Sequence, residues 1–231
     1  MSVLAQEQPS TLIRAHAYAP PPDAGLKIIY EDAHLLAIDK LAGLLSVPGR
    51  GVDLQDCALH RVQLRYPQAL LVHRLDEATS GLLLFAMSPA VQKTLSAAFE
   101  ARQIKKTYHA WIHGSEVPES GVIDAPIAID WPQRPLRKID WEAGQSAITH
   151  FQILSKCERS AQILCRLEPQ TGRTHQLRVH MRHIGHPIVG DRLYGLPQDD
   201  APRLMLHASE LRFGHPLDSS KAIHIECTPP F

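Results

Sequence analysis

Short strand-like runs dominate this chain of 231 residues and limit its fold more than any other feature. Apolar and β-branched residues gather into runs of about five to nine residues, and turn-forming residues separate the runs. Only three stretches have a helical period, and they do not alternate regularly with the strands. This order predicts an α+β fold instead of a repeated βαβ unit. The expected strands are residues 26–30, 35–39, 81–87, 106–113, 146–154, 161–167, 205–213 and 222–227.

The helical segments carry recognisable end signals. Ser88 followed by Pro89 is typical of a helix N-terminus, since serine caps the free amides and proline fits the first turn. Gly185 marks the end of a later helix. The segment 124–137 holds three prolines and is expected to be a long surface loop. The predicted helices are residues 54–66, 88–101 and 174–184.

The first 25 residues differ from the rest of the chain. They include the run Pro20-Pro21-Pro22 and little periodic apolar pattern, so we expect a flexible arm over residues 1–25 and one domain over residues 26–231. The longest apolar run, residues 81–87, is too short to span a bilayer, and the N-terminus lacks a signal-peptide pattern. We therefore expect a cytoplasmic protein without membrane contact.

Several cofactor and catalytic motifs are missing. The sequence contains no phosphate-binding loop, no dinucleotide fingerprint and no serine-nucleophile elbow. Four histidines in residues 175–186 are the strongest metal-ligand candidates, but three arginines crowd them and would repel a cation, which favours solvated or hydrogen-bonded histidines. The four cysteines lack metal-site spacing and are predicted to be reduced, mostly buried thiols. We expect no metal and no cofactor.

The charges balance in total but not along the chain. There are 24 Lys and Arg residues against 24 Asp and Glu residues. Basic residues nevertheless gather in segments 102–106, 134–138 and 173–192, and the first two have aromatic residues close by. One such cluster is more often a solvated face than a site, whereas three favour an RNA-facing surface.

A second candidate site is the polar segment 73–81, His-Arg-Leu-Asp-Glu-Ala-Thr-Ser-Gly, which lies between two apolar runs. Side chains of such a segment reach into a cleft when it follows strand structure. Asp76 has two interpretations at this point. It either caps a turn through the amides of Thr79 or Ser80, or it is a catalytic carboxylate.

Taken together, these segments resemble the RluA-type pseudouridine synthase family. Residues 73–81 match its catalytic-aspartate motif, and residues 171–178, Thr-Gly-Arg-Thr-His-Gln-Leu-Arg, match its second signature. Segments 105–108, 185–195 and 203–208 match further motifs. The resemblance runs from Leu26 to the C-terminus. It implies a mixed, mainly antiparallel central sheet with flanking helices and a central active-site cleft.

Two departures from the family pattern stand out. Lys40-Leu41-Ala42-Gly43 replaces the usual Lys-Pro-x-Gly, a change expected to alter a turn without touching a catalytic group. Longer relatives carry an RNA-binding S4 domain ahead of the catalytic domain, whereas only the 25-residue arm precedes Leu26 here. The grip on RNA is therefore expected to come from the catalytic domain.

The resemblance implies isomerisation of uridine to pseudouridine in RNA, in which the base leaves the sugar through N1 and rejoins it through C5. Asp76 would act at the ribose anomeric centre, and whether through a covalent ester or a glycal stays open. Arg173 would hold Asp76 anionic, and Tyr108 would stack on the uracil. Arg74 would fill the place that the flipped base leaves.

The remaining site residues implied are substrate contacts: His73, Lys105, Lys106, Arg178 and Leu206. The implied partners are the tRNA anticodon stem-loop and a loop of 23S rRNA, bound by a monomer. One alternative is a nucleoside or glycoside hydrolase built on Asp76, which would need a second carboxylate; the nearest, Glu77, points away if the segment is extended. The other is a non-catalytic RNA-binding module.

Overall fold

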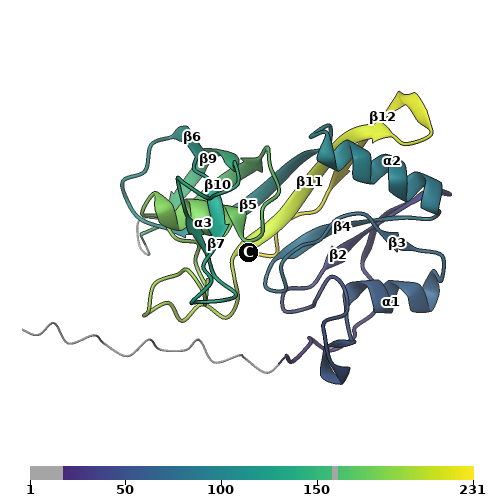
Figure 1. Ribbon diagram of the computed structural model, residues 1–231, viewed down its shortest axis with the longest axis horizontal. Coiled ribbons are helices and arrows are strands. Elements are labelled where there is room, and N and C mark those ends of the chain that lie inside the picture. Colours follow the sequence, from purple (N-terminus) through teal and green to yellow (C-terminus); the bar gives the residue numbers. More distant parts are fainter. Residues whose placement is uncertain (1–17, 158–160) are drawn as a thin grey trace, which may run out of the picture.

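The computed structural model describes residues 18–157 and 161–231 (Figure 1). The expected first hairpin is present, formed by β1 (Ile28–Glu31) and β2 (Leu35–Lys40). Strand β4 (Ser80–Ala86) pairs antiparallel with β2, and all seven of its residues are buried. The two-residue strand β3 (Leu70–Leu71) also pairs with β4. The apolar run of residues 81–87 is thus an interior strand, as its composition predicted.

Four strands build the other half of the sheet. In spatial order they are β5 (Lys105–His113), β10 (Gln162–Pro169), β9 (Ile148–Cys157) and β6 (Ser120–Asp124), each antiparallel to its neighbour. The sequence did not predict β6, because its five residues include a serine, a glycine and an aspartate and give little β signal.

Strand β11 (Leu206–His215) joins the two halves. It lies between β4 and β5, parallel to β4 and antiparallel to β5, and its second half pairs with β12 (Asp218–Glu226). The ten-stranded sheet therefore runs in the order β1-β2-β4-β11-β5-β10-β9-β6, with β3 on β4 and β12 on β11. This arrangement confirms the α+β class and the mainly antiparallel sheet.

A glycine permits the close approach of β4 and β11. Gly81 has a φ of 110°, and a Cβ atom there would lie 2.3 Å from the carbonyl oxygen of Ala208. Only glycine combines this backbone conformation with the space that the neighbouring strand leaves. The glycine that ends the polar segment 73–81 is thus required by the pairing of strands far apart in sequence.

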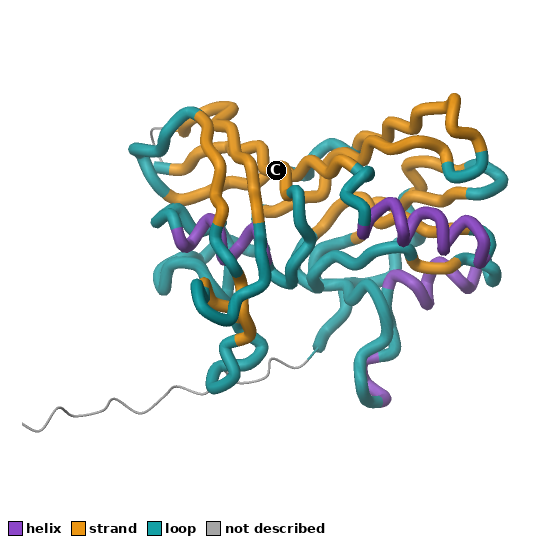
Figure 2. The backbone as a smooth tube through the Cα atoms, turned by 45° about the horizontal axis from the view of Figure 1, so that its top comes forward, coloured by secondary structure: helices purple, strands orange, loops and turns teal. Residues whose placement is uncertain are grey.

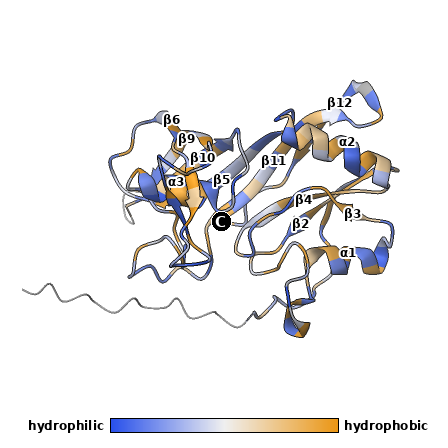
Figure 3. Cartoon of the chain, viewed as in Figure 1, coloured by the Kyte–Doolittle hydropathy of each residue, from blue (hydrophilic) through white to orange (hydrophobic). Residues whose placement is uncertain are grey.

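The helices cover both faces of the sheet. Helix α1 (Ala58–Arg65) packs on one face of β2 and β4, and α2 (Pro89–Glu100) packs on the opposite face. Helix α3 (Gln176–His183) packs against β5 and β10. Figure 2 shows the strands as a curved layer with the helices against it, and Figure 3 shows hydrophobic residues along the strands between α1 and α2. None of the described helices is long and apolar enough to cross a membrane.

The helix ends follow from local chemistry. Ser88 Oγ accepts a hydrogen bond from the amide of Val91, as expected of an N-cap. Helix α1 begins later than predicted, because a short 3-10 helix (η1, Val52–Leu54) comes first and Cys57 Sγ then accepts the amide of His60.

The proline-rich segment 124–137 is not a simple loop. It contains β7 (Ile127–Ile129), which pairs with β8 (Arg137–Ile139) in a separate two-stranded sheet, so the prediction of a loop was wrong there. At the connection the Arg134 guanidinium lies 3.6 Å from the centre of the exposed Trp131 ring. Strands of three residues are too short to give an alternating pattern in the sequence.

The proposed N-terminal arm is described only from residue 18. Tyr18 Oη donates to the carbonyl of Asp56 at 2.7 Å, and Arg61 Nη2 donates to the carbonyl of Pro21 at 2.7 Å. The end of the arm therefore contacts the domain beside α1, and residues 1–17 lie outside the described part of the chain. Three of the four cysteines, Cys57, Cys165 and Cys227, are buried as predicted.

Candidate active site

A cleft of about 1180 Å³ opens where the polar segment 73–79, β5 and the segment before α3 meet. Eight lysines and arginines line it, against three acidic residues, Asp76, Glu77 and Glu100. A cleft lined by an excess of positive charge attracts a polyanion, so a chain with no net charge still presents a local RNA-binding potential. The cations are Arg74, Arg102, Lys106, Arg134, Arg173, Arg178, Arg192 and Arg203. Six of them come from the three basic segments of the sequence, and Arg74 and Arg203 lie outside those segments.

A narrower recess of about 100 Å³ shares part of this lining. Asp76, Tyr108 and Leu206 all line it, although they come from a loop and two different strands. Tyr108 lies opposite Ala208 in the β5–β11 pairing, and Leu206 is the first residue of β11 and is 3% exposed. The insertion of β11 between β4 and β5 therefore places these side chains together.

Hydrogen bonds from Lys40 and Ser46 fix the loop that carries Asp76. Lys40 Nζ donates to three carbonyls, including those of Leu44 at 2.7 Å and Glu77 at 3.1 Å. Ser46 Oγ donates to the Leu75 carbonyl at 2.7 Å. Hydrogen bonds on both sides of Asp76 fix its backbone, which is the usual requirement for a preorganised catalytic group.

The Asp76 carboxylate faces helix α3. Its Oδ2 atom lies 3.4 Å from Arg178 Nη1 and 4.0 Å from His175 Nε2. The turn at Thr79 is closed by the backbone carbonyl of Asp76, at 3.1 Å from the Thr79 amide. The side chain is thus directed at a buried cation, and the main chain makes the turn contact.

Arg178 is itself held rigidly. Its Nε and Nη2 atoms donate to the two carboxylate oxygens of Asp191 at 2.8 and 2.7 Å, and its guanidinium lies 5.1 Å from the centre of the Tyr194 ring. The side chains of Arg178 and Asp191 are 4% and 0% exposed. A bidentate ion pair in such a buried position fixes the direction of the remaining Nη1, which points at Asp76.

Arg173 occupies a different position from the one expected. The sequence assigned the contact with Asp76 to Arg173, whereas Arg178 makes it in the structure. Arg173 Nε donates to the carbonyl of Ser146 at 3.1 Å, and its backbone amide donates to Gln176 Oε1. Because α3 begins at Gln176, Arg173 precedes the helix at the cleft edge, while Arg178 lies on the buried face of the helix.

Two of the expected substrate contacts, His73 and Lys106, line the cleft and make hydrogen bonds within the protein. His73 Nε2 accepts the Leu84 amide at 3.1 Å, and its ring stacks on Phe99 with centroids 4.8 Å apart. Burial lowers the pKa of His73 to about 3, so the ring is neutral at physiological pH. Lys106 Nζ donates to the carbonyl of Thr171 at 3.1 Å, and burial lowers its pKa to about 8.

The other expected contacts differ in exposure. Arg74 is exposed and lines the cleft next to Asp76. Lys105 is exposed, and the described lining of the cleft includes Lys106 but not Lys105. Tyr108 is half-buried beside Asp76. Desolvation and then the negative charge of Asp76 raise its pKa well above the ordinary value, which keeps the phenol protonated at neutral pH.

Sequence reasoning missed three supporting residues: Lys40, His175 and Asp191. Lys40 lies in the segment that departs from the family pattern, which was expected to touch no catalytic group, yet it is bonded to the residue after Asp76. His175 has a φ of 58° and its Nδ1 lies 2.7 Å from Tyr194 Oη. A non-glycine residue in the left-handed region of an otherwise regular motif is a sign of a functional position, but only the structure reveals it.

The histidines of segment 175–186 make separate hydrogen bonds. His180 lies between Thr149 Oγ1 and the carbonyl of Ala125, at 3.0 and 2.9 Å. His186 Nδ1 lies 3.1 Å from the carbonyl of His113. These partners agree with hydrogen-bonded histidines, the interpretation that the neighbouring arginines favoured.

The fold and the site together define a class. A mainly antiparallel sheet presents a loop aspartate, a buried arginine and a tyrosine in a basic cleft, and the RNA pseudouridylate synthase family matches residues 34–183. The chain belongs to this family, and it isomerises uridine to pseudouridine in RNA.

Individual members of the family are similar to this chain over most of its length. The chain is 44% identical over 202 residues to the dual-specificity RNA pseudouridine synthase RluA of Escherichia coli (strain K12), covering 86% of this chain and 91% of the relative. It is 42% identical over 206 residues to RluA of Yersinia pestis, covering 88% and 99%. Human RNA pseudouridylate synthase domain containing 1 has a similar structure, with a TM-score of 0.77 at 28% identity, covering 92% and 87% of the two chains.

Proposed function

We propose that Asp76 acts at the ribose anomeric centre of a uridine whose base enters the recess beside Tyr108. The observation that carries this proposal is the convergence of Asp76, Tyr108 and Arg178 on one recess from three separate elements. Developing positive charge on the sugar is stabilised by a carboxylate, in the manner of a retaining glycosidase. Either a covalent ester or a glycal is compatible with this position.

Arg178 is proposed as the group that keeps Asp76 anionic and aimed. The bidentate bond to Asp191 prevents Arg178 from turning toward solvent, so its Nη1 stays within reach of Asp76. A preorganised cation of this kind costs no reorganisation during the reaction. Arg173 and Arg74, at the edge of the cleft, are then available for phosphates or for the space that the flipped base leaves.

The proposed substrates are the anticodon stem-loop of tRNA and a loop of 23S rRNA. The relatives in Escherichia coli and Yersinia pestis are named as dual-specificity RNA pseudouridine synthases. Unpaired loops suit the cleft because a loop base leaves its stack at lower cost than a base in a duplex. We also propose that a monomer acts on these RNAs in the cytoplasm.

The direct test is Asp76→Asn with Glu77→Gln as the matched control. Pseudouridine in tRNA and 23S rRNA fragments is mapped by carbodiimide-blocked primer extension. We expect no product with Asp76→Asn, product with Glu77→Gln, and RNA affinity within about threefold of the parent chain for both. Product formed by Asp76→Asn at the parent rate would refute the role of Asp76, and release of free uracil would indicate the hydrolase alternative.

A further inference from the structure

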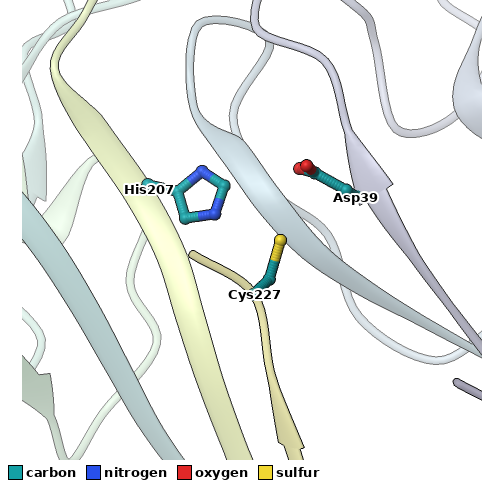
Figure 4. A group of neighbouring side chains, drawn as sticks. All are labelled: Asp39, His207 and Cys227. Carbon is teal, nitrogen blue, oxygen red and sulfur yellow. The ribbon is translucent and has the colours of Figure 1, made fainter. Parts of the chain in front are cut away.

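A second group of chemically active side chains lies outside the reaction recess. Asp39, His207 and Cys227 each direct one ligand atom toward the others, and these atoms all lie within 4.8 Å of one another (Figure 4). The three residues come from β2, β11 and the segment after β12. We propose that they form a zinc site that joins the C-terminal segment to the strands around the catalytic loop.

Strand pairing brings these residues together. Asp39 pairs with Leu82 across β2 and β4, and His207 pairs with Ser80 across β4 and β11. Residues 80 and 82 point to one face of β4, so the side chains of Asp39 and His207 share that face. The first half of β11 pairs with β4 and the second half with β12, so the end of β12 arrives beside the start of β4. The Cys227 amide then donates to the carbonyl of Ser209 at 2.8 Å.

The two ring nitrogens of His207 have different surroundings. The residue is fully buried, and its Nδ1 lies 2.8 Å from Ser80 Oγ. Arg203, which can only donate, also bonds to Ser80 Oγ, and the carbonyl of Leu206 lies 3.5 Å from the same hydroxyl oxygen, where it can accept the Ser80 proton when Nδ1 is the donor. Metal binding at Nε2 requires the tautomer in which Nδ1 carries the proton and donates to Ser80 Oγ, because that tautomer leaves the lone pair on Nε2.

The Nε2 atom of His207 is the feature that indicates a ligand. It is buried and has no hydrogen-bond partner among the described residues. In Figure 4 this side of the ring faces the sulfur of Cys227. A buried polar atom without a partner destabilises the folded chain, and a metal ion bound to this atom would remove that penalty. A histidine that donates through Nδ1 and binds through Nε2 is the usual arrangement at metal sites.

The donor set suits zinc. One carboxylate oxygen, one imidazole nitrogen and one thiolate are ligands that Zn²⁺ accepts, and water completes four-coordination. The charges of Asp39 and a Cys227 thiolate balance the ion. Binding breaks the S–H bond of Cys227, forms a zinc–sulfur bond and releases the proton to solvent. Lys27 Nζ lies 2.8 Å from Asp39 Oδ2, but its side chain is 66% exposed and the other carboxylate oxygen remains to bind the ion.

The site has a structural consequence for the active site. Ser80, the hydrogen-bond partner of His207, follows Asp76 by four residues, and Arg203 lines the cleft. An ion on Nε2 fixes the His207 tautomer, and with it the hydrogen bonds that hold Ser80 and Arg203. Zinc at this position would therefore stabilise the base of the catalytic loop without touching the substrate.

An exposed group must be distinguished from this site. Glu210, His224 and Glu226 also lie within ligand distance of one another. His224 Nε2 is already 2.7 Å from Glu210 and 3.0 Å from Glu226, and both His224 and Glu226 are exposed. This arrangement is accounted for as a surface ion-pair cluster. His224→Ala is consequently the control variant for binding at the surface.

The test is a titration of the metal-free full chain with Co²⁺ and with Zn²⁺. We expect one equivalent of Co²⁺ to bind with a sulfur-to-cobalt charge-transfer absorption, and Zn²⁺ to displace it and raise the melting temperature. In Cys227→Ser this absorption disappears and affinity falls at least tenfold, and Asp39→Asn weakens binding in the same direction. His224→Ala and Cys157→Ser keep the parent absorption and affinity.

Circular dichroism of each metal-free variant shows whether it is folded, so a loss of binding is separated from a loss of structure. The proposal is overturned if the parent chain gives no charge-transfer absorption. It is also overturned if a folded Cys227→Ser binds Co²⁺ as the parent does, or if His224→Ala alone abolishes binding. None of these outcomes depends on RNA modification, so the zinc site and the proposed function are tested separately.

Discussion

Exchanging each of two arginines for lysine decides which of them serves Asp76. In the structure Arg178 donates to Asp76 and to Asp191, whereas Arg173 donates to the carbonyl of Ser146. Lysine keeps the positive charge but lacks the planar fork that engages one carboxylate bidentately while a third nitrogen reaches another. Arg178→Lys therefore removes the directed contact with Asp76, and Arg173→Lys leaves it intact.

The size of the effect follows from the hydrogen bond that each exchange removes. A hydrogen bond between charged groups contributes about 1.5–3 kcal/mol. At about 1.4 kcal/mol per factor of ten, losing it from the transition state slows the chemical step roughly 10- to 150-fold. Arg173 gives up only a bond to a backbone carbonyl at the cleft edge, so Arg173→Lys should change the rate less than about threefold.

The assay is single-turnover release of tritium from RNA that contains [5-³H]uridine, since C5 exchanges its hydrogen for the new glycosidic bond. Saturating enzyme separates the chemical step from RNA affinity. Melting curves for both variants define a temperature at which each is folded, because Arg178→Lys also weakens the buried pair with Asp191. A greater loss of rate for Arg173→Lys than for Arg178→Lys would refute the assignment.

Three further results are expected. Gly81→Ala should lower the free energy of unfolding by more than about 3 kcal/mol, because the new Cβ would meet the β11 backbone. Gly214→Ala is the control, since a Cβ there meets open space, and it should cost about 1 kcal/mol or less. Urea unfolding measures both variants, and equal midpoints would contradict the packing argument. Burial lowers the pKa of His73 in the folded state to about 3. The contribution of the neutral His73 ring to the free energy of unfolding is therefore complete above about pH 6.5 and is lost as the pH falls toward 3. A urea midpoint that stays unchanged between pH 7 and pH 5 would contradict this expectation. Arg74→Ala should modify a flexible loop at the parent rate but a structured stem-loop more slowly, and equal rates on both would exclude a role in base flipping.

The distribution of basic residues along the sequence predicted part of the cleft lining. The three basic segments were visible in the sequence although the net charge is zero, and each contributes to the lining of the cleft. Which members face the cleft was not visible. Lys105 and Lys106 are neighbours on β5, yet only Lys106 belongs to the lining, because successive residues of a strand point to opposite faces.

Arg173 and Arg178, the two arginines of the second signature, show what the sequence could not predict about the site. Both lie in residues 171–178, and their spacing alone does not say which one faces Asp76, a residue about a hundred positions earlier. The answer depends on where α3 starts and which of its faces packs on β10. Likewise, only strand pairing brings Cys227 and Asp39 beside the unpartnered Nε2 of His207, and no local sequence pattern shows this.

The amino-acid sequence alone determined the α+β class, the start of α2 directly after its N-cap Ser88 and the loop position of Asp76. Alternation, capping and turn chemistry act between residues close along the chain. The tertiary structure alone decided that Arg178 contacts Asp76, and that β7 and β8 pair. It also decided that Asp39, His207 and Cys227 share one place. These features depend on the register between distant strands, above all the insertion of β11 between β4 and β5, and no local pattern specifies that register.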